Sequence, residues 1–155
     1  MAGTTDEAPS RREAFAAGVH AETGIDDDMI RALVHAFYER VRGDAVLGPI
    51  FAARITDWEP HLAKMCAFWS SVMLMTGRYH GRPMPAHAPL PVGGTHFDHW
   101  LALFEATARD VCPPAAAERF VEKSRLIAQS LEMGIATSRG VMLAPGERLA
   151  GRGAA

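Results

Sequence analysis

The chain has 155 residues, of which 48% are apolar and 22% charged, a balance typical of one globular domain with a sizeable core. Its 16 Lys and Arg residues against 18 Asp and Glu residues leave no basic excess for nucleic acid or an anionic membrane. Two cysteines outside any Cys-x-x-Cys motif, and no signal-like or membrane-length apolar run, favour a soluble cytoplasmic protein without a disulfide framework or a thiolate zinc site.

The first predicted helix begins near residue 26. Residues 1–24 are small, polar and aperiodic, so we expect a flexible N-terminal extension there. The acidic run at 26–28 suits a helix N-terminus, and Gly43 ends the helix. Tyr38 lies on its apolar face, either as a core aromatic or as a donor that points into a pocket. That face carries Met29, Ile30, Leu33, Val34, Phe37, Tyr38 and Val41 at helical spacing.

A turn and a second helix follow. The turn at residues 47–51 is expected to bring Phe51 into the core. Asp57 is the expected cap of a helix that runs to about Thr76. One broad face of this helix carries His61, Met65, Phe68, Trp69 and Val72. His61 is the polar end of that stripe, and it is either a solvated side chain or a functional one.

A long loop at residues 77–94 separates the two halves of the chain, and loops of this length are generally functional or disordered. Its segment 83–91 reads Pro-Met-Pro-Ala-His-Ala-Pro-Leu-Pro, and four prolines exclude an ordinary long helix. We therefore expect a stiff, irregular arm that holds His87. A histidine on a loop is more often solvated than a ligand, so the context of His87 has to decide its role.

Two further helices complete an all-α pattern of four main helices. Thr95 and Asp98 resemble a capping box for the third helix, and the fourth runs from near Pro114 to about Thr137. No segment alternates with the period of a strand. We expect one helical domain at residues 25–139 and a flexible C-terminal tail at 140–155.

A cavity between these helices would suit a planar apolar cofactor, and haem is the obvious candidate. His87 would bind the iron through one ring nitrogen, while a carbonyl oxygen of the proline-rich arm accepts from the other. Tyr38, His61 and Trp100 would supply donors on the opposite side. The expected apolar lining consists of Phe51, Met65, Phe68, Trp69, Phe97 and Trp100.

Seven short motifs, in one order and with matching spacings, resemble the truncated haemoglobins of group III over roughly residues 26–138. The glycine pairs that mark the other truncated groups are absent between the first helices, where only Gly24 occurs, and before His87, which fits group III. The motifs are Phe37-Tyr38, Leu47-Gly48-Pro49-Ile50-Phe51, Trp58-x-x-His61, Phe68-Trp69, Tyr79-x-Gly81-x-Pro83, His87-x-x-Leu90-Pro91 and Phe97-x-x-Trp100-Leu101-x-Leu103-Phe104.

The resemblance implies a two-over-two helical sandwich around haem b, with His87 as the proximal iron ligand. It also implies Tyr38, His61 and Trp100 as distal residues, with Met65 lining the distal side. His96 and His99 stay open as alternative iron ligands near the edge of the pocket. His87 ranks above both, because they lie at the start of a helix whose Trp100 already faces the pocket.

The haem propionates need cations or hydroxyls near the pocket mouth. The loop before His87 offers Arg78, Tyr79, His80 and Arg82. Arg78 and Tyr79 are the preferred contacts, with Lys64 of the second helix as the next choice.

Two haem-dependent functions fit these residues. The first is reversible binding of dioxygen or a related gas, such as carbon monoxide or nitric oxide, for storage, transport or sensing. The second is redox chemistry, either of dioxygen with nitric oxide or of peroxide. Hydrogen bonds from Tyr38 and Trp100 to bound dioxygen would slow its release, and slow release favours redox chemistry over transport. The sequence has no Gly-x-Gly-x-x-Gly fingerprint of a flavin or nicotinamide site, so we expect an external reductase. We also expect the protein to be a monomer.

Two haem-free alternatives belong to other classes. A zinc site could draw on the histidines His80, His87, His96 and His99. A helical interaction module with a packed apolar core would need no ligand at all. Zinc would explain neither the aromatic lining nor Tyr38.

Overall fold

The computed structural model describes residues 8–151, and within that range the chain is all-helical, as predicted. No helix in this part of the chain is both long and apolar enough to cross a membrane. The helices are α1 (Arg11–Thr23), α2 (Asp27–Gly43), α3 (Leu47–Ala52), α4 (Trp58–Leu74), α5 (Pro83–His87), α6 (Gly94–Val111) and α7 (Pro114–Ser138).

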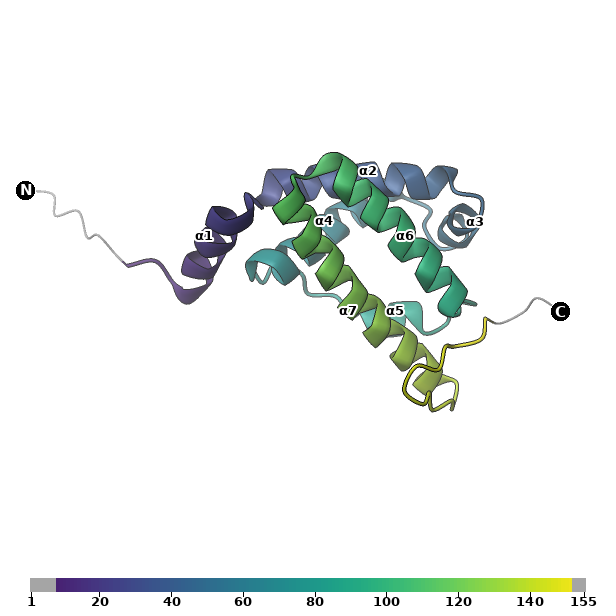
Figure 1. The fold of residues 1–155 in the computed structure, drawn as a ribbon. Helices are drawn as coiled ribbons and strands as arrows, with labels where there is room; N and C mark the ends of the chain where they lie inside the picture. Colours follow the sequence, from purple (N-terminus) through teal and green to yellow (C-terminus); the bar gives the residue numbers. More distant parts are fainter. Residues whose placement is uncertain (1–7, 152–155) are drawn as a thin grey trace, which may run out of the picture.

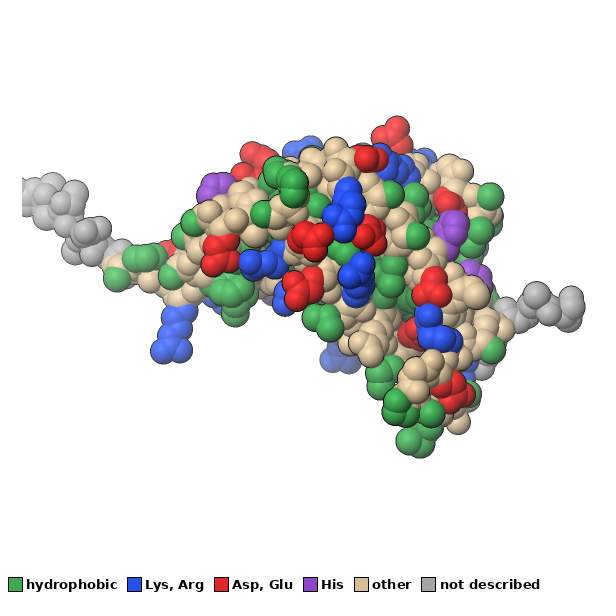
Figure 2. All heavy atoms as spheres, in the orientation of Figure 1, with side chains coloured by type: hydrophobic (Ala, Val, Ile, Leu, Met, Phe, Trp, Pro, Cys, Tyr) green, Lys and Arg blue, Asp and Glu red, His purple; other side chains and the backbone are tan. Residues whose placement is uncertain are grey.

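The long helices form two crossing layers, with α6 and α7 in front of α4 in Figure 1. Helix α2 packs against α4 and α6, α6 packs against α7, and the short α3 and α5 lie on α2 and α7 respectively. Three fully buried aromatic rings, Phe37, Phe104 and Phe120, come from α2, α6 and α7 and join the layers. Acidic and basic side chains alternate over the face formed by α6 and α7, without a large patch of one sign (Figure 2).

Local signals set most of the predicted helix ends. The side chain of Asp26 accepts a hydrogen bond from the Met29 backbone N–H at 2.8 Å and starts α2. Asp57 is the N-cap residue of α4, as predicted, although its side chain makes no cap hydrogen bond. The expected capping box of Thr95 and Asp98 is wrong, because α6 begins at Gly94 and the His96 imidazole accepts from the Gly93 N–H at 3.0 Å.

The predicted flexible extension at residues 1–24 is wrong for Arg11–Thr23, which form α1. Ser10 and Glu13 make a reciprocal capping box at the start of this helix. Val19 is buried where α1 packs against the α4 and α7 layers. Residues 1–7 of the expected extension lie outside the described range.

The predicted flexible tail at 140–155 is wrong as well for the residues up to 151. Leu149 is buried, and its carbonyl accepts from the Gly94 N–H at 2.7 Å. Residues 152–155 of the expected tail lie outside the described range.

The proline-rich arm also differs from its prediction, because Pro83–His87 form one short helix, α5, with proline in its first turn.

Asp44 holds the corner between α2 and α3. Its carboxylate accepts from the Val46 and Leu47 N–H groups at 2.9 and 2.8 Å and lies 2.8 Å from Nε2 of His99. The Leu47 N–H, followed by the hydrogen bond with His99, lowers the pKa of Asp44. Asp44 therefore connects the α2–α3 corner to α6.

Replacing Asp44 with alanine is expected to lower the free energy of unfolding by about 1 kcal/mol at neutral pH, the typical cost of losing a helix cap. Because the pKa of Asp44 is lower in the folded state, its contribution is present above the unfolded pKa and is lost as pH falls through the folded pKa. The difference in Tm between the two proteins should thus shrink below about pH 4. Asp57→Ala is the matched control, since Asp57 makes no cap bond. Equal losses in both variants at pH 7 would contradict this role for Asp44.

Candidate functional site

His87 is the last residue of α5 and is partly buried. Its Nδ1 lies 2.6 Å from the Pro83 carbonyl oxygen. A carbonyl oxygen can only accept, so Nδ1 carries the proton and Nε2 keeps its lone pair. The expectation that the proline-rich arm supplies an acceptor for this ring is confirmed. The tautomer is the one that suits a metal ligand at Nε2.

Tyr38 of α2 is buried, and the partly buried His61 of α4 packs against its ring. Their ring centroids are 5.0 Å apart in an edge-to-face arrangement, and the rings of Phe51 and Trp58 surround Tyr38 at 5.8 and 6.0 Å. Burial, with a smaller contribution from the nearby Cys66, raises the pKa of Tyr38 above its ordinary value. The phenol therefore stays protonated at physiological pH and can donate a hydrogen bond.

The imidazole of His61 has an unused nitrogen. Its Nε2 is buried and has no hydrogen-bond partner within residues 8–151. Burial comes first among the causes that lower the pKa of His61, followed by the charges of Lys64 and His87. His61 is thus neutral at pH 7, and His87 lies near enough to act on it electrostatically. The structure brings these two histidines to one region, as the sequence predicted.

Trp100 stands at the end of an aromatic stack that crosses the core. Its ring stacks on Phe104 at 5.1 Å, and Phe104 in turn stacks on Trp69 at 5.1 Å. Phe37 meets the Trp100 ring edge-on at 5.2 Å. Trp69 is only 4% exposed and lies deep in this stack, whereas Trp100 is partly exposed beside it.

The other expected lining residues fall into two apolar clusters. Phe51, Met65 and Phe68 are partly buried and pack on the main core together with Trp100. Phe97 belongs to a second cluster, in which it packs with residues of the loop after His87. The lining therefore comes from α3, α4 and α6, the elements around His61 and His87.

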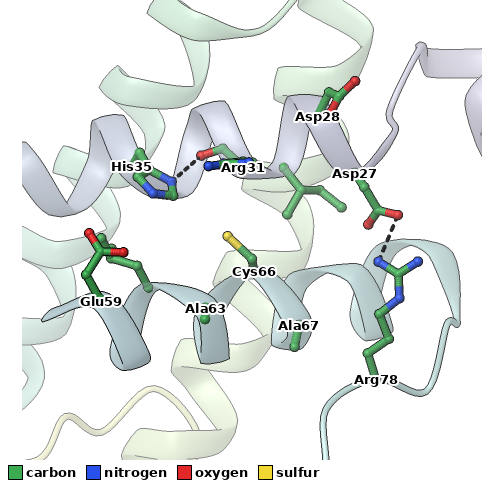
Figure 3. A pocket seen from close by; sticks show the side chains of 11 residues that line it. Asp27, Asp28, Arg31, His35, Glu59, Ala63, Cys66, Ala67 and Arg78 are labelled. Carbon is green, nitrogen blue, oxygen red and sulfur yellow. Dashed lines mark hydrogen bonds and ion pairs between the residues drawn. The ribbon is translucent and has the colours of Figure 1, made fainter.

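The expected propionate contacts lie in different surroundings. Arg78 pairs with Asp27 at 3.0 Å and lines a groove of about 450 Å³ between α2 and α4, with Cys66 on its floor (Figure 3). The Tyr79 ring packs edge-on against Phe68 at 5.2 Å, and burial raises the pKa of Tyr79. Arg78 thus points toward the start of α2, whereas Tyr79 packs beside a lining residue. The other loop and helix candidates, His80, Arg82 and Lys64, are exposed.

The two alternative ligand histidines have other partners. His96 caps α6, and His99 pairs with Asp44. Within the described part of the chain, no group of three or more His, Cys, Asp or Glu side chains is placed to hold a metal ion. These contacts leave His87 as the candidate iron ligand and offer no support for the zinc alternative.

The residues present fit a planar cofactor with a metal centre. The lining is aromatic, an imidazole whose Nδ1–H donates to a carbonyl is available, and within residues 8–151 a buried nitrogen of His61 lacks a partner. A buried polar atom without a hydrogen-bond partner is costly unless a ligand or water binds to it.

Cys66 lies near Tyr38 and was not predicted as a residue of the site. It follows Met65 in the sequence and does not lie on the apolar stripe of its helix, and no second cysteine forms a motif with it.

Comparisons with known proteins agree with this geometry. A family model described as bacterial-like globin matches residues 19–131. The group 3 truncated hemoglobin ctb of Campylobacter jejuni is 34% identical over 113 residues, which cover 70% of this chain and 89% of that protein. The crystal structure of the group III truncated hemoglobin from Campylobacter jejuni superposes with a TM-score of 0.65 at 35% identity, covering 69% of this chain and 88% of the other. The hemoglobin of Chloroflexus aurantiacus gives a TM-score of 0.60 at 25% identity, covering 73% and 95%.

Proposed function

This chain belongs to the bacterial-like globin family as a truncated haemoglobin of group III, and we propose that it carries haem b on His87 for redox chemistry of dioxygen and nitric oxide. Membership in the family implies a haem cofactor and a diatomic gas, such as dioxygen, as its ligand. When bound, haem would supply an iron that binds an imidazole and a diatomic gas. The single observation that carries the proposal is the contact between the buried Tyr38 and His61, near His87.

His87 anchors the cofactor in this proposal. Its Nδ1–H donates to the Pro83 carbonyl at 2.6 Å, which fixes the ring orientation and makes Nε2 a better electron donor to a metal. Phe51, Met65 and Phe68 exclude water around it. Tyr79, and Arg78 if it exchanges its Asp27 partner, are the proposed contacts of the propionates.

Tyr38 and His61 act on the gas. Tyr38 holds its proton because it is buried, so its hydroxyl donates toward an oxygen atom that gains negative charge. His61 is neutral at pH 7, and its buried Nε2 is available to the same ligand. Trp100 can only donate, through Nε1. Donors fixed in a dry site act more strongly than in water, so gas release is slow.

Slow release suits turnover better than transport. A protein that holds dioxygen firmly would present it to nitric oxide, and the two would combine to one nitrate anion with one electron from the reduced protein. The electrons that restore the reduced state come from an external reductase in this proposal. Residues 25–139 form the proposed functional domain of a cytoplasmic monomer, and α1 and the segment up to 151 pack onto it.

An absorption spectrum tests the cofactor, and rapid mixing tests the reaction. Purified protein supplemented with haem should show a strong Soret band at one haem per chain, which shifts when carbon monoxide is added after dithionite. Mixing the dioxygen-loaded protein with nitric oxide should yield one nitrate per haem. A folded protein without a Soret band would overturn the haem assignment. A haem protein that releases dioxygen without forming nitrate would instead indicate reversible storage or sensing.

His61→Ala is expected to speed carbon monoxide association several-fold. The imidazole, in the first turn of α4, packs edge-on against the rings of both Tyr38 and Trp58, so its removal opens space beside Tyr38. Flash photolysis measures the rate. His35→Ala is the control, because His35 is an exposed histidine of α2 whose ring contacts only the Arg31 carbonyl of its own helix among the hydrogen bonds of the described residues. Equal rates in His61→Ala and the unmodified protein would assign His61 a structural role.

A further inference from the structure

The C-terminal strap, residues 141–151, returns along the end of α7 to the start of α6 (Figure 1). Arg148 fastens it there. Its guanidinium donates to Glu132 of α7 at 3.0 Å, to Asp98 of α6 at 2.8 Å and to the Gly94 carbonyl at 2.9 Å. The Glu132 side chain is only 9% exposed, so one end of this clamp lies in the interior. A forked guanidinium that satisfies three partners at once fixes geometry as well as charge.

Residues 88–94, here called the proximal loop, join His87 to the start of α6. Several hydrogen bonds connect this loop to the strap and to the end of α7. The Leu90 N–H donates to the carbonyl of His87 at 3.0 Å, and the Leu90 carbonyl accepts from Arg139 at 2.6 Å. Arg139 also donates to the Ala150 carbonyl in the strap at 3.3 Å. At the far end of the loop, the Gly94 N–H donates to the Leu149 carbonyl at 2.7 Å. The strap therefore holds the loop near both of its ends.

Apolar packing supports the same contact. Leu149 and Val92 are buried together with Ile135 in the second apolar cluster, which includes Phe97 at its edge. At Gly93, an added Cβ would lie 2.6 Å from the Leu149 carbonyl oxygen, although the backbone there is an ordinary extended one with φ of −138°. Glycine is thus required at this position by the close approach of the strap and not by its own conformation.

We propose that the C-terminal strap positions the proximal histidine, with Arg148 and Arg139 as positioning residues that act on His87 through the proximal loop. The inference rests on the proposed role of His87 as haem ligand. A loop held at Leu90 and Gly94 limits the movement of the His87 backbone, and α5 itself has only five residues to restrain it. Replacing Arg148 should weaken the hold on haem although Arg148 is not one of the proposed haem contacts.

The test compares Arg148→Ala with Arg109→Ala in the full chain. Arg109 is a matched control, since it also binds two carboxylates of α6 and α7, and its side chain is 46% exposed against 48% for Arg148. Haem transfer to an excess of apomyoglobin should be about tenfold faster from Arg148→Ala, the lower end of the range for outer partners of metal ligands, because Arg148 reaches His87 only through the loop. The iron–histidine stretching band of the reduced protein should broaden or shift. Arg109→Ala should match the unmodified protein in both.

A second variant keeps the test valid if Arg148→Ala does not fold. Gly93→Ala displaces the strap sterically, and Gly18→Ala is its control because nothing lies within 4 Å of an added Cβ there. Gly93→Ala should also raise hydrogen exchange of the proximal loop in the haem-free protein. Unchanged haem transfer and an unchanged iron–histidine band in Arg148→Ala and Gly93→Ala would overturn the inference and leave the proposed function intact. An unmodified protein that binds no haem would overturn both.

Discussion

Replacing His87 with alanine is expected to abolish stoichiometric haem binding. The Nδ1–H of His87 donates to the Pro83 carbonyl oxygen at 2.6 Å, and this bond orients the ring. His87 lies in the same region as Tyr38 and His61. Without it, His96 is engaged as a helix cap and His99 in an ion pair, and His61 stays on α4 against Tyr38. Haem titration followed by the Soret band measures the loss, and the iron–histidine stretching band should disappear from any residual complex.

The matched control is His80→Ala, an exposed histidine seven residues earlier on the same loop. It should bind one haem per chain with the unmodified spectrum. Free imidazole added to His87→Ala should restore part of the haem binding if the variant has lost only the ligand. A normal iron–histidine band in His87→Ala, with the helix content preserved by circular dichroism, would show that another side chain binds the iron.

Tyr38→Phe is expected to keep haem and to accelerate dioxygen release by about ten- to a hundredfold. The phenol is buried and holds its proton, so it donates to a ligand atom with negative charge, and such hydrogen bonds contribute about 1.5 to 3 kcal/mol. Phenylalanine keeps the ring contacts with Phe51 and Trp58 and removes only the hydroxyl. Stopped-flow replacement of dioxygen by carbon monoxide measures the rate.

Tyr79→Phe gives a contrast with the same chemical change. Its ring packs against Phe68 on the loop before α5, and its hydroxyl folds over Gly81, away from the Tyr38–His61 pair. We expect a change in haem retention from this variant and none in dioxygen release. A dioxygen release rate in Tyr38→Phe equal to that of the unmodified protein would remove Tyr38 from its proposed role as donor.

The four long helices followed from the sequence because their signals are local. The stripe from Met29 to Val41 repeats every three or four residues, and Asp26 caps it through a bond to a residue three positions away. The proline-rich arm was informative for the same reason. The acceptor of His87 is Pro83, only four residues earlier, so the sequence could indicate a fixed imidazole although it did not indicate the short helix that fixes it.

The surroundings of the site depended on the tertiary structure. Tyr38 and His61 belong to different helices, and their contact follows from the crossing of α2 and α4. The depth of Trp69 in the stack with Phe104 also depends on how α4 meets α6. Periodicity shows which side of a helix is apolar, but it cannot separate a residue in the centre of the core from one that borders a cavity.

The two chain ends show the limit most clearly. Helix α1 has few buried apolar residues and so gives a weak periodic signal, even though Ser10 and Glu13 provide a local cap. The strap has no periodic signal at all. Arg148 binds Glu132, Asp98 and Gly94, which lie 16 to 54 residues earlier in the sequence. The position of the strap therefore depends on the packing of α6 against α7. The sequence by itself determined the four long helices and the candidate ligand, since short-range hydrogen bonds and apolar spacing specify them. Only the tertiary structure decided which contacts hold the loop after that ligand, because those contacts join residues far apart in the sequence.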